Sequence, residues 1–196
     1  MAKTYDAEQI ESGRLCVRDG DDCFLLEYPP KRRMTDVSKL IWDFKENQPQ
    51  AIKAMLEILL PQFYKWEKRV RDRDRCRYVV TIPGHARGKL NLACETVAET
   101  LAGTFPWLQH LPSSLRRIKT VAKASYAGSY GERPKYDDHI QSIRYSGTKV
   151  SKGEGILMMD DVFTTSETSA ACRDILRKAS GCGIVVGLFM GRTQND

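Results

Sequence analysis

ILMMDDVFTTSET, residues 156–168, is the stretch that decides the fold of this 196-residue chain. Its leading apolar residues follow two glycines and predict a short strand that is buried on both faces, as in parallel sheets. The apolar spacing of residues 168–176 predicts a helix that packs on that sheet. Asp160 and Asp161 then lie at the carboxyl end of the strand, where open α/β sheets bind their ligands.

A strand, a tight turn and a helix N-terminus in this order favour a phosphate site. Free backbone N–H groups and the positive end of the helix dipole converge there. Two other interpretations of the acidic pair stay open: the Walker B element of a nucleotide hydrolase, and a core strand followed by an Asp-rich turn. The hydrolase requires the phosphate loop G-x-x-x-x-G-K-[ST], which the sequence lacks. The nearest candidate, residues 84–90, is one residue short and ends in Leu90.

Residues 156–168 resemble the phosphoribosyl pyrophosphate signature of type I phosphoribosyltransferases, in which such a strand ends in two acids and a Thr-rich loop. The resemblance implies that Asp160 and Asp161 are catalytic and face the ribose 2′ and 3′ hydroxyls. Ionised carboxylates only accept hydrogen bonds, and a vicinal diol offers two donors. The resemblance also implies Mg²⁺ at Asp160 and Asp161, bound mostly through the ligand and water. The implied ribose 5-phosphate site consists of Val162, Phe163, Thr164, Thr165, Ser166, Glu167 and Thr168.

Ser166 departs from that signature, which usually has Gly, Ala or another very small residue at this position. The backbone there must approach the phosphate closely, and an unusual dihedral is easiest for Gly. A left-handed conformation would cost serine about 1 kcal/mol. Thr164 and Glu167 match a capping box, and we expect Glu167 to point away from the phosphate because its charge would repel the ligand.

A second loop is predicted at the same edge of the sheet. Residues 76–82 are apolar and β-branched and predict the first strand of the main sheet, which is followed by a basic loop and a helix from about residue 90 to residue 101. A small basic loop beside a helix N-terminus suits a pyrophosphate, and an ordinary strand-to-helix connection is the open alternative. The predicted pyrophosphate-binding residues are Pro83, Gly84, His85, Arg87, Gly88, Lys89, Arg117 and Arg133.

Three further segments narrow the resemblance to the ComF-like branch, whose members are associated with DNA uptake in competence. Residues 82–88 hold an Ile-Pro strand end and an Arg-Gly pair, residues 116–120 parallel an Arg-rich strand, and residues 184–193 are similar to the family's last strand and its closing Ala-Arg-Thr. The N-terminal zinc ribbon of many members is missing. The likeness covers about residues 34–193, and it implies a Rossmann-like α/β fold with a mainly parallel sheet flanked by helices and a small hood region.

The domain organisation follows from the pattern at the N-terminus. We expect residues 1–33 to form a hairpin and hood segment, with its turn at residues 18–21, and residues 34–196 to form the phosphoribosyltransferase-like domain. Helices are predicted from residues 35–36 and from Pro49, the second ended or kinked by Pro61. Residues 120–152 are rich in Gly, Tyr and charge, and they predict a functional lid or a disordered connection.

Composition narrows the classes of protein. The hydrophobic content of 41% and the charged content of 29% are ordinary for a soluble protein, and no segment resembles a signal peptide or a membrane span. We therefore expect a cytoplasmic protein that does not bind membranes. Six cysteines without a C-x-x-C pair predict buried, reduced thiols. His85, His110 and His139 have no metal-ligand spacing, and we expect surface positions for them, His85 also being a candidate ligand contact.

Three functions follow from the sequence. The first is a phosphoribosyltransferase that uses phosphoribosyl pyrophosphate and Mg²⁺ and acts on a nucleobase-type acceptor. The second is a module that senses phosphoribosyl pyrophosphate or a nucleotide without turnover. The third is a competence-type DNA-uptake accessory protein; the net charge of +6 fits nucleic acid as well as an anionic substrate, although nucleic acid is not favoured. Homodimer formation stays open.

Overall fold

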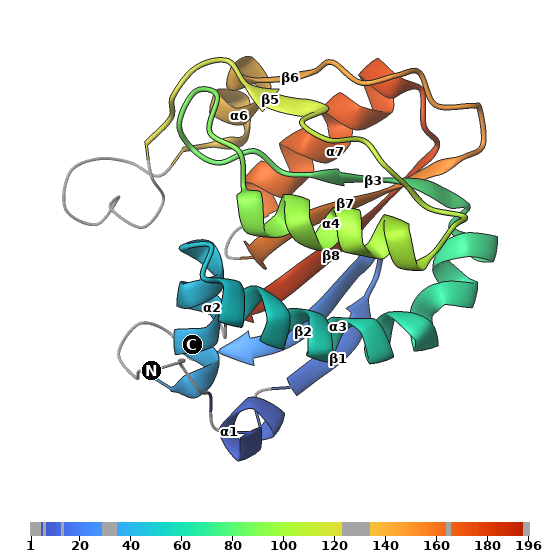
Figure 1. Cartoon of the computed structure of the whole chain (residues 1–196). Coiled ribbons are helices and arrows are strands. Elements are labelled where there is room, and N and C mark those ends of the chain that lie inside the picture. The colour runs from blue at the N-terminus through green and yellow to red at the C-terminus, as the bar shows by residue number, and fades with distance from the viewer. Residues whose placement is uncertain are drawn as a thin grey trace.

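A computed structural model of the chain describes residues 5, 7–12, 14–28, 35–122, 134–163 and 166–193. Its centre is a six-stranded sheet in the order β1-β2-β8-β7-β3-β4 (Figure 1). The strands are β1 (Arg14–Asp19), β2 (Asp22–Tyr28), β3 (Cys76–Thr81), β4 (Gln109–His110), β7 (Gly155–Phe163) and β8 (Ile184–Thr193). All neighbouring pairs are parallel except β1 with β2. The expectation of a mainly parallel α/β sheet is confirmed.

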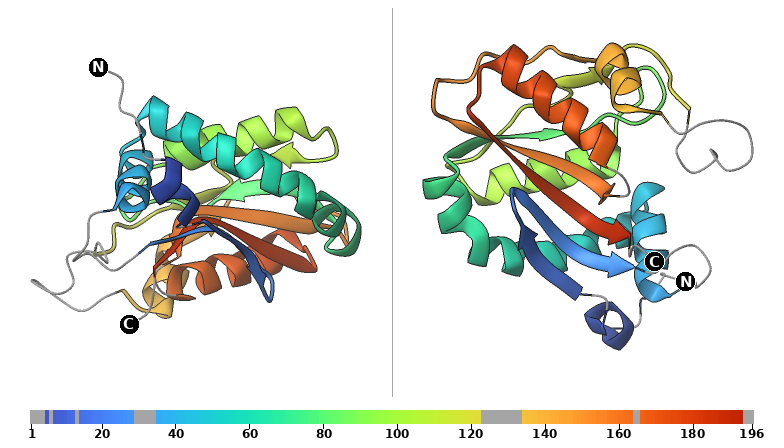
Figure 2. Two further views of the ribbon diagram at one scale, coloured as in Figure 1. Left: turned by 90° about the horizontal axis from the view of Figure 1, so that it is seen from below. Right: turned by 180° about the vertical axis from the view of Figure 1, so that it is seen from behind.

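Helices cover both faces of the sheet, as Figure 2 shows from below and from behind. One face carries α2 (Asp36–Lys45), α3 (Pro49–Lys68) and α4 (Leu92–Thr104). The other carries α7 (Ser166–Ser180), with α6 (Tyr136–Ser142) and a small antiparallel sheet of β5 (Leu115–Arg117) and β6 (Ile143–Tyr145) beside it. The remaining described helices are α1 (Ala7–Ser12) and the π-helical turn η1 (Arg69–Arg73).

Strand β7 shows why the sequence forms this layered core. Leu157 and Met159 pack in the cluster that contains α2, α3 and α4, whereas Ile156 and Met158 pack with α7. All four side chains are buried, because successive residues of a strand face opposite sides of a sheet that is covered twice. An unbroken apolar run is therefore the pattern this strand requires.

Pro61 was expected to end or kink its helix; α3 continues past it to Lys68, so that Pro61 does not end the helix. Pro61 is exposed, whereas Leu59 and Phe63 on either side of it are fully buried. The missing backbone hydrogen bond thus lies on the solvent side. Burial of the apolar face holds the helix together through this position.

The N-terminal hairpin is confirmed, with its turn at Gly20, where φ is 57°. Its second strand lies parallel to β8 over residues 22–28, so that residues 14–28 contribute two strands to the same sheet as residues 34–196. Asp22 accepts a hydrogen bond of 2.5 Å from Arg173 of α7, which ties the hairpin to the helix layer.

The partners of β7 end at different points. Its pairing with β3 stops at Met159, whereas its pairing with β8 continues to Phe163. Asp160 and Asp161 therefore lie within the strand but beyond the end of β3. This step in the sheet leaves one side of the acidic pair open to the loop that follows β3. Within the described ranges, no helix is long and apolar enough to cross a membrane.

Candidate functional site

The two acids of β7 meet one amide from the start of α4. Asn91 lies immediately before α4, and its side-chain oxygen accepts a hydrogen bond from the backbone N–H of Cys94, which caps the helix. Its Nδ2 lies 3.4 Å from Oδ1 of Asp160 and 3.4 Å from Oδ2 of Asp161. One Asn side chain thus begins a helix and links the two carboxylates across the step in the sheet.

The two carboxylates leave opposite faces of the strand, as the alternation along β7 requires. Asp161 follows Met159 in register and lies 3.7 Å from Nζ of Lys45, at the end of α2. Asp160 follows Met158, on the face where Cys172 and Arg117 interact with its charge. The pair therefore receives positive charge from two different layers of the fold.

The carboxyl of Asp160 has a raised pKa. Burial raises the pKa of its carboxyl well above the usual value, and the neighbouring charge of Asp161 adds to the effect. Three contacts act in the opposite direction: the backbone N–H of Asp161, which donates to Oδ1 of Asp160 at 2.9 Å, the charge of Lys45, and the amide of Asn91. Many protein atoms surround Asp160, yet part of its surface stays accessible to solvent.

The loop after β3 uses its backbone for internal contacts. Within the loop, the N–H of Gly84 donates to the carbonyl of Lys89, and the N–H of Lys89 donates to the carbonyl of Ala86. Outside it, the N–H of Arg87 donates to the hydroxyl of Thr120, and the N–H of Gly88 donates to the carbonyl of Arg117. Gly88 has a φ of 71°, which suits glycine. Pro83 is buried, Gly84 and His85 are partly buried, and residues 87–89 are exposed. The loop consequently presents the side chains of Arg87 and Lys89 to solvent rather than these four amides.

Arg117 lies inside the protein, with 3% of its surface exposed. Its Nε donates to the carbonyl of Gly84 at 2.6 Å, one terminal nitrogen donates to the hydroxyl of Ser142 at 2.6 Å, and the other lies 3.3 Å from Nδ1 of His139. Burial lowers the pKa of this guanidinium, while Cys172 and Asp160 act in the opposite direction. These contacts hold the loop after β3 against α6.

His139 was expected at the surface and is instead 5% exposed. It belongs to the short helix α6, which packs against α7, and its Nε2 lies 3.1 Å from the hydroxyl oxygen of Thr168. His110 is partly buried, and its Nε2 lies 2.9 Å from a carboxylate oxygen of Glu95. Burial lowers the pKa of His139, and the charge of Arg117 lowers it further.

Ser166 is the first residue of α7 and is exposed. Its carbonyl accepts a hydrogen bond from Ser169 at 2.9 Å. Glu167 and Thr168 are partly buried in the same turn.

The other residues of the predicted phosphate set divide into two groups. Val162 is buried, and the ring of Phe163 packs against Phe24 and Phe189 at centroid distances of 5.4 and 5.0 Å. Both side chains therefore pack in the core. Thr164, Thr165 and Arg133 lie outside the described residues.

The buried thiols near the acids are not reactive groups. Cys172 is fully buried, and burial with the charge of Asp160 raises the pKa of its thiol to about 12. The pKa of Cys94 is also raised, chiefly by burial and then by Asp161 and Asp160. All six cysteines are free, as the spacing of the sequence predicts. Cys94 and Cys172 are therefore protonated packing residues at neutral pH.

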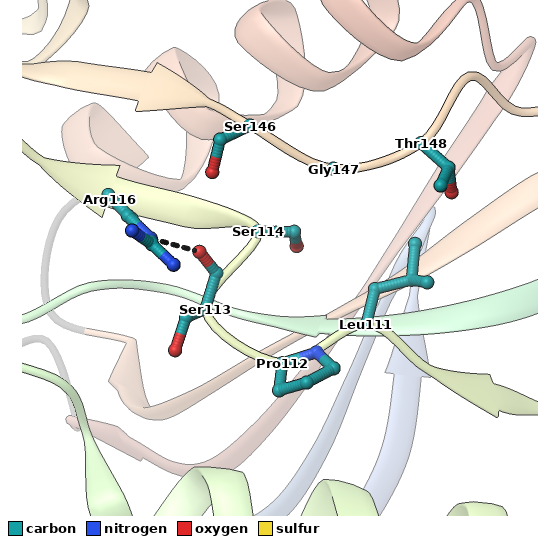
Figure 3. A pocket seen from close by; sticks show the side chains of 8 residues that line it. All are labelled: Leu111, Pro112, Ser113, Ser114, Arg116, Ser146, Gly147 and Thr148. Carbon is teal, nitrogen blue, oxygen red and sulfur yellow. Dashed lines mark hydrogen bonds between the residues drawn. The ribbon is translucent and has the colours of Figure 1, made fainter.

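A shallow pocket of about 280 Å³ lies elsewhere, between the start of β5 and the segment after β6 (Figure 3). Arg116 lies on one side of it and donates to the carbonyl of Ser113 at 3.0 Å. The lining residues are Leu111, Pro112, Ser113, Ser114, Arg116, Ser146, Gly147 and Thr148. None of them belongs to the predicted site, and the lining carries no carboxylate, thiol or imidazole.

Three site residues were missed by sequence reasoning: Lys45, Asn91 and His139. Asn91 carried a usable signal, since Asn directly before an apolar helix is a preferred N-cap and such a residue lies at the carboxyl edge of the sheet. Lys45 carried none, because a Lys in the last turn of a helix is common for reasons of the helix dipole alone. Only the packing of α2 beside β7 brings it to Asp161.

Comparisons with known proteins do not assign this chain to a family. No family model matches the chain, and no curated protein matches it. Among solved structures, a crystal structure of an adenine phosphoribosyltransferase superposes on 76% of this chain and 73% of its own, with 14% sequence identity and a TM-score of 0.43. A similarity this weak does not assign the chain to a family.

Proposed function

We propose that this protein binds phosphoribosyl pyrophosphate with Mg²⁺ at the carboxyl edge of its sheet and transfers the phosphoribosyl group to a nucleobase-type acceptor. The observation that carries the proposal is the acidic pair beyond the end of β3, linked by Asn91 and flanked by a basic loop on one side and the start of α7 on the other. A pentose that carries one phosphate and one pyrophosphate needs two anion sites around a diol site, in this order.

Each part of the donor has a matching chemistry. Asp160 and Asp161 accept hydrogen bonds from the ribose 2′ and 3′ hydroxyls. The turn from Ser166 to Thr168 supplies the N–H groups of a helix N-terminus for the 5′-phosphate. Arg87 and Lys89, exposed on the loop after β3, supply positive charge for the pyrophosphate.

Magnesium fits this donor set. Within the described ranges, no group of three or more His, Cys, Asp or Glu side chains could hold a metal ion. Mg²⁺ needs no such group, since it is commonly bound by one or two carboxylates together with water and substrate phosphates. Asp160 and Asp161 would hold it, and when bound it would neutralise part of the charge of the pyrophosphate.

The reaction breaks the bond between C1′ and a pyrophosphate oxygen, and the pyrophosphate leaves with the electron pair. Positive charge develops at C1′, as in glycosidic bond cleavage, before an acceptor nitrogen bonds to this carbon. The two carboxylates favour that positive charge, and the cations of the loop after β3 favour the negative charge of the leaving group.

Titration calorimetry with phosphoribosyl pyrophosphate and Mg²⁺ tests donor binding. The double variant Asp160→Asn with Asp161→Asn should lose magnesium-dependent binding, while Glu57→Gln, an exposed carboxylate on α3, should bind as the wild type does. Equal affinity of the double variant and the wild type would contradict the assignment of the acids.

Two further measurements separate the other functions. Release of pyrophosphate when nucleobases are added demonstrates transfer, whereas donor binding without release identifies a sensing module. Binding to single-stranded DNA with a steep salt dependence would identify the nucleic-acid function instead, because each phosphate contact releases counterions.

A further inference from the structure

We propose that His139 is a positioning residue that couples the two anion-binding segments, joining the loop at residues 83–89 to the start of α7 through Arg117 and Thr168. The inference rests on the proposed function for the identity of the anions. It adds a connection between two segments that are more than 75 residues apart in the sequence.

The connection is a continuous series of side-chain contacts. The carbonyl of Gly84 accepts from Nε of Arg117, a terminal nitrogen of Arg117 faces Nδ1 of His139, and Nε2 of His139 faces the hydroxyl of Thr168. Arg117 and His139 are 3% and 5% exposed, so that water does not compete for these contacts. A displacement of the loop at Gly84 is thereby transmitted to the first turn of α7.

The chemistry of the two partners fixes the tautomer of His139. A guanidinium only donates hydrogen bonds, so Nδ1 must be the acceptor and carries no proton. The single proton of the neutral ring then lies on Nε2, which donates to Oγ1 of Thr168. The hydroxyl proton of Thr168 is consequently directed to another acceptor, and the 5′-phosphate at the start of α7 is the anion that would accept it.

Protonation of His139 would disrupt the connection at one specific point. A proton on Nδ1 faces the N–H of Arg117, so that this hydrogen bond is lost, whereas Nε2 still donates to Thr168. Arg117 of β5 opposes the protonation, and Asp138 of α6 and Glu167 of α7 favour it; burial and Arg117 prevail and lower the pKa of His139. The loop after β3, rather than α7, is therefore the segment released at low pH.

Nitrogen NMR of the histidines tests the tautomer without any ligand. In wild-type protein at pH 7.5, His139 should show a protonated Nε2 and an unprotonated Nδ1, with the assignment made by comparison with His139→Asn. Its titration midpoint should lie below 6.5, the ordinary histidine value. A protonated Nδ1 at pH 7.5 would overturn the inference.

Two substitutions of His139 test its contact with Arg117 and its contact with Thr168 separately. In His139→Asn, the amide oxygen replaces Nδ1 as acceptor for Arg117, but the side chain is too short for Thr168. In His139→Gln, the amide nitrogen replaces Nε2 as donor to Thr168, and the acceptor at Nδ1 is lost. Asn should weaken binding of ribose 5-phosphate about tenfold and leave that of pyrophosphate unchanged, and Gln should do the opposite.

The pH profile supplies the second readout. At pH values below 6.5, the wild type should bind pyrophosphate more weakly than His139→Asn does. Phosphates themselves titrate near pH 6, and comparing two proteins with the same ligand cancels that contribution. Equal losses for both ligands in both variants would indicate a purely structural role and refute the coupling. Failure of the wild type to bind either ligand would instead refute the proposed function, and the tautomer measurement would still stand.

Discussion

Replacement of Asp160 by Asn should make the protein more stable and at the same time remove donor binding. In the folded protein the carboxylate of Asp160 is crowded by protein atoms and repelled by Asp161, and both effects raise its pKa. An Asn side chain has nearly the same shape, and its oxygen can still accept from the N–H of Asp161 and from Asn91. The substitution removes the charge and keeps the contacts.

The size of the gain follows from the geometry. Nδ2 of Asn91 lies 3.4 Å from one oxygen of each carboxylate, so these two oxygens are less than about 7 Å apart. At an effective dielectric constant of about 20, two unit charges at this distance repel each other by about 2 kcal/mol. Lys45 offsets part of this repulsion. We therefore expect a gain of about 1–2 kcal/mol at pH 7, or a Tm higher by about 2–8 °C for a chain of this size.

The pH dependence gives the sign of the effect. The folded-state pKa of Asp160 lies above the unfolded value near 3.8. Between these two pKa values, the folded protein binds more protons than the unfolded protein does. The free energy of unfolding of the wild type then falls as the pH rises through this interval. The advantage of Asp160→Asn should be absent near pH 3.5 and should grow as the pH rises toward 7. Urea unfolding at a series of pH values, followed by circular dichroism, measures this difference.

Glu57→Gln, on the exposed side of α3, serves as the matched carboxylate-to-amide control, and its effect should stay within about 0.5 kcal/mol at every pH. Asp160→Ala should gain less than Asp160→Asn, because it leaves the N–H of Asp161 without its acceptor. An Asp160→Asn protein no more stable than the wild type at pH 7, or one whose gain persists unchanged at pH 3.5, would refute the reasoning.

Three further substitutions probe the fold around the site. Asn91→Ala removes the cap of α4 and should lower the unfolding free energy by about 1 kcal/mol in urea titrations. Gly187→Ala should cost about 1–3 kcal/mol in the same assay, because its Cβ would collide with the side chain of Asp22. Lys45→Gln, at a half-exposed ion pair with Asp161, should change stability by less than about 1 kcal/mol yet weaken donor binding, which calorimetry would measure as a higher Kd.

The parts of the fold that depend on local pattern could be predicted from the sequence. The apolar run before Asp160, the helical spacing after Ser166, and the Asp-Gly turn at Gly20 each determine one element, and all three elements form as expected. Pro61 was expected to end or kink the helix, and the helix does not end there. The effect of a proline depends on which side of the helix the missing hydrogen bond lies, and this is known only once the buried face is known.

The parts of the site that depend on packing could not be predicted in this way. Asn91 and Asp160 are 69 residues apart, and they meet only because β3 and β7 are neighbours in the sheet. His139 follows a Gly-rich, charged segment typical of a surface connection, yet α6 packs against α7 and buries it. A charged side chain such as Arg117 likewise looks exposed in sequence, and its three acceptors come from the loop after β3 and from two residues of α6.

The position of the N-terminal hairpin governs the order in which this chain can fold during synthesis. Strand β2 is synthesised long before its parallel partner β8, with which it forms pairs such as Asp22 and Gly187. Until then, the buried residues Leu25 and Leu26 have no sheet to enter, and one edge of the hairpin is open to other chains. Contacts of such long sequence separation form slowly. Completion of the central sheet therefore waits until β8 has been synthesised, and until then the hairpin can pair with strands of other chains.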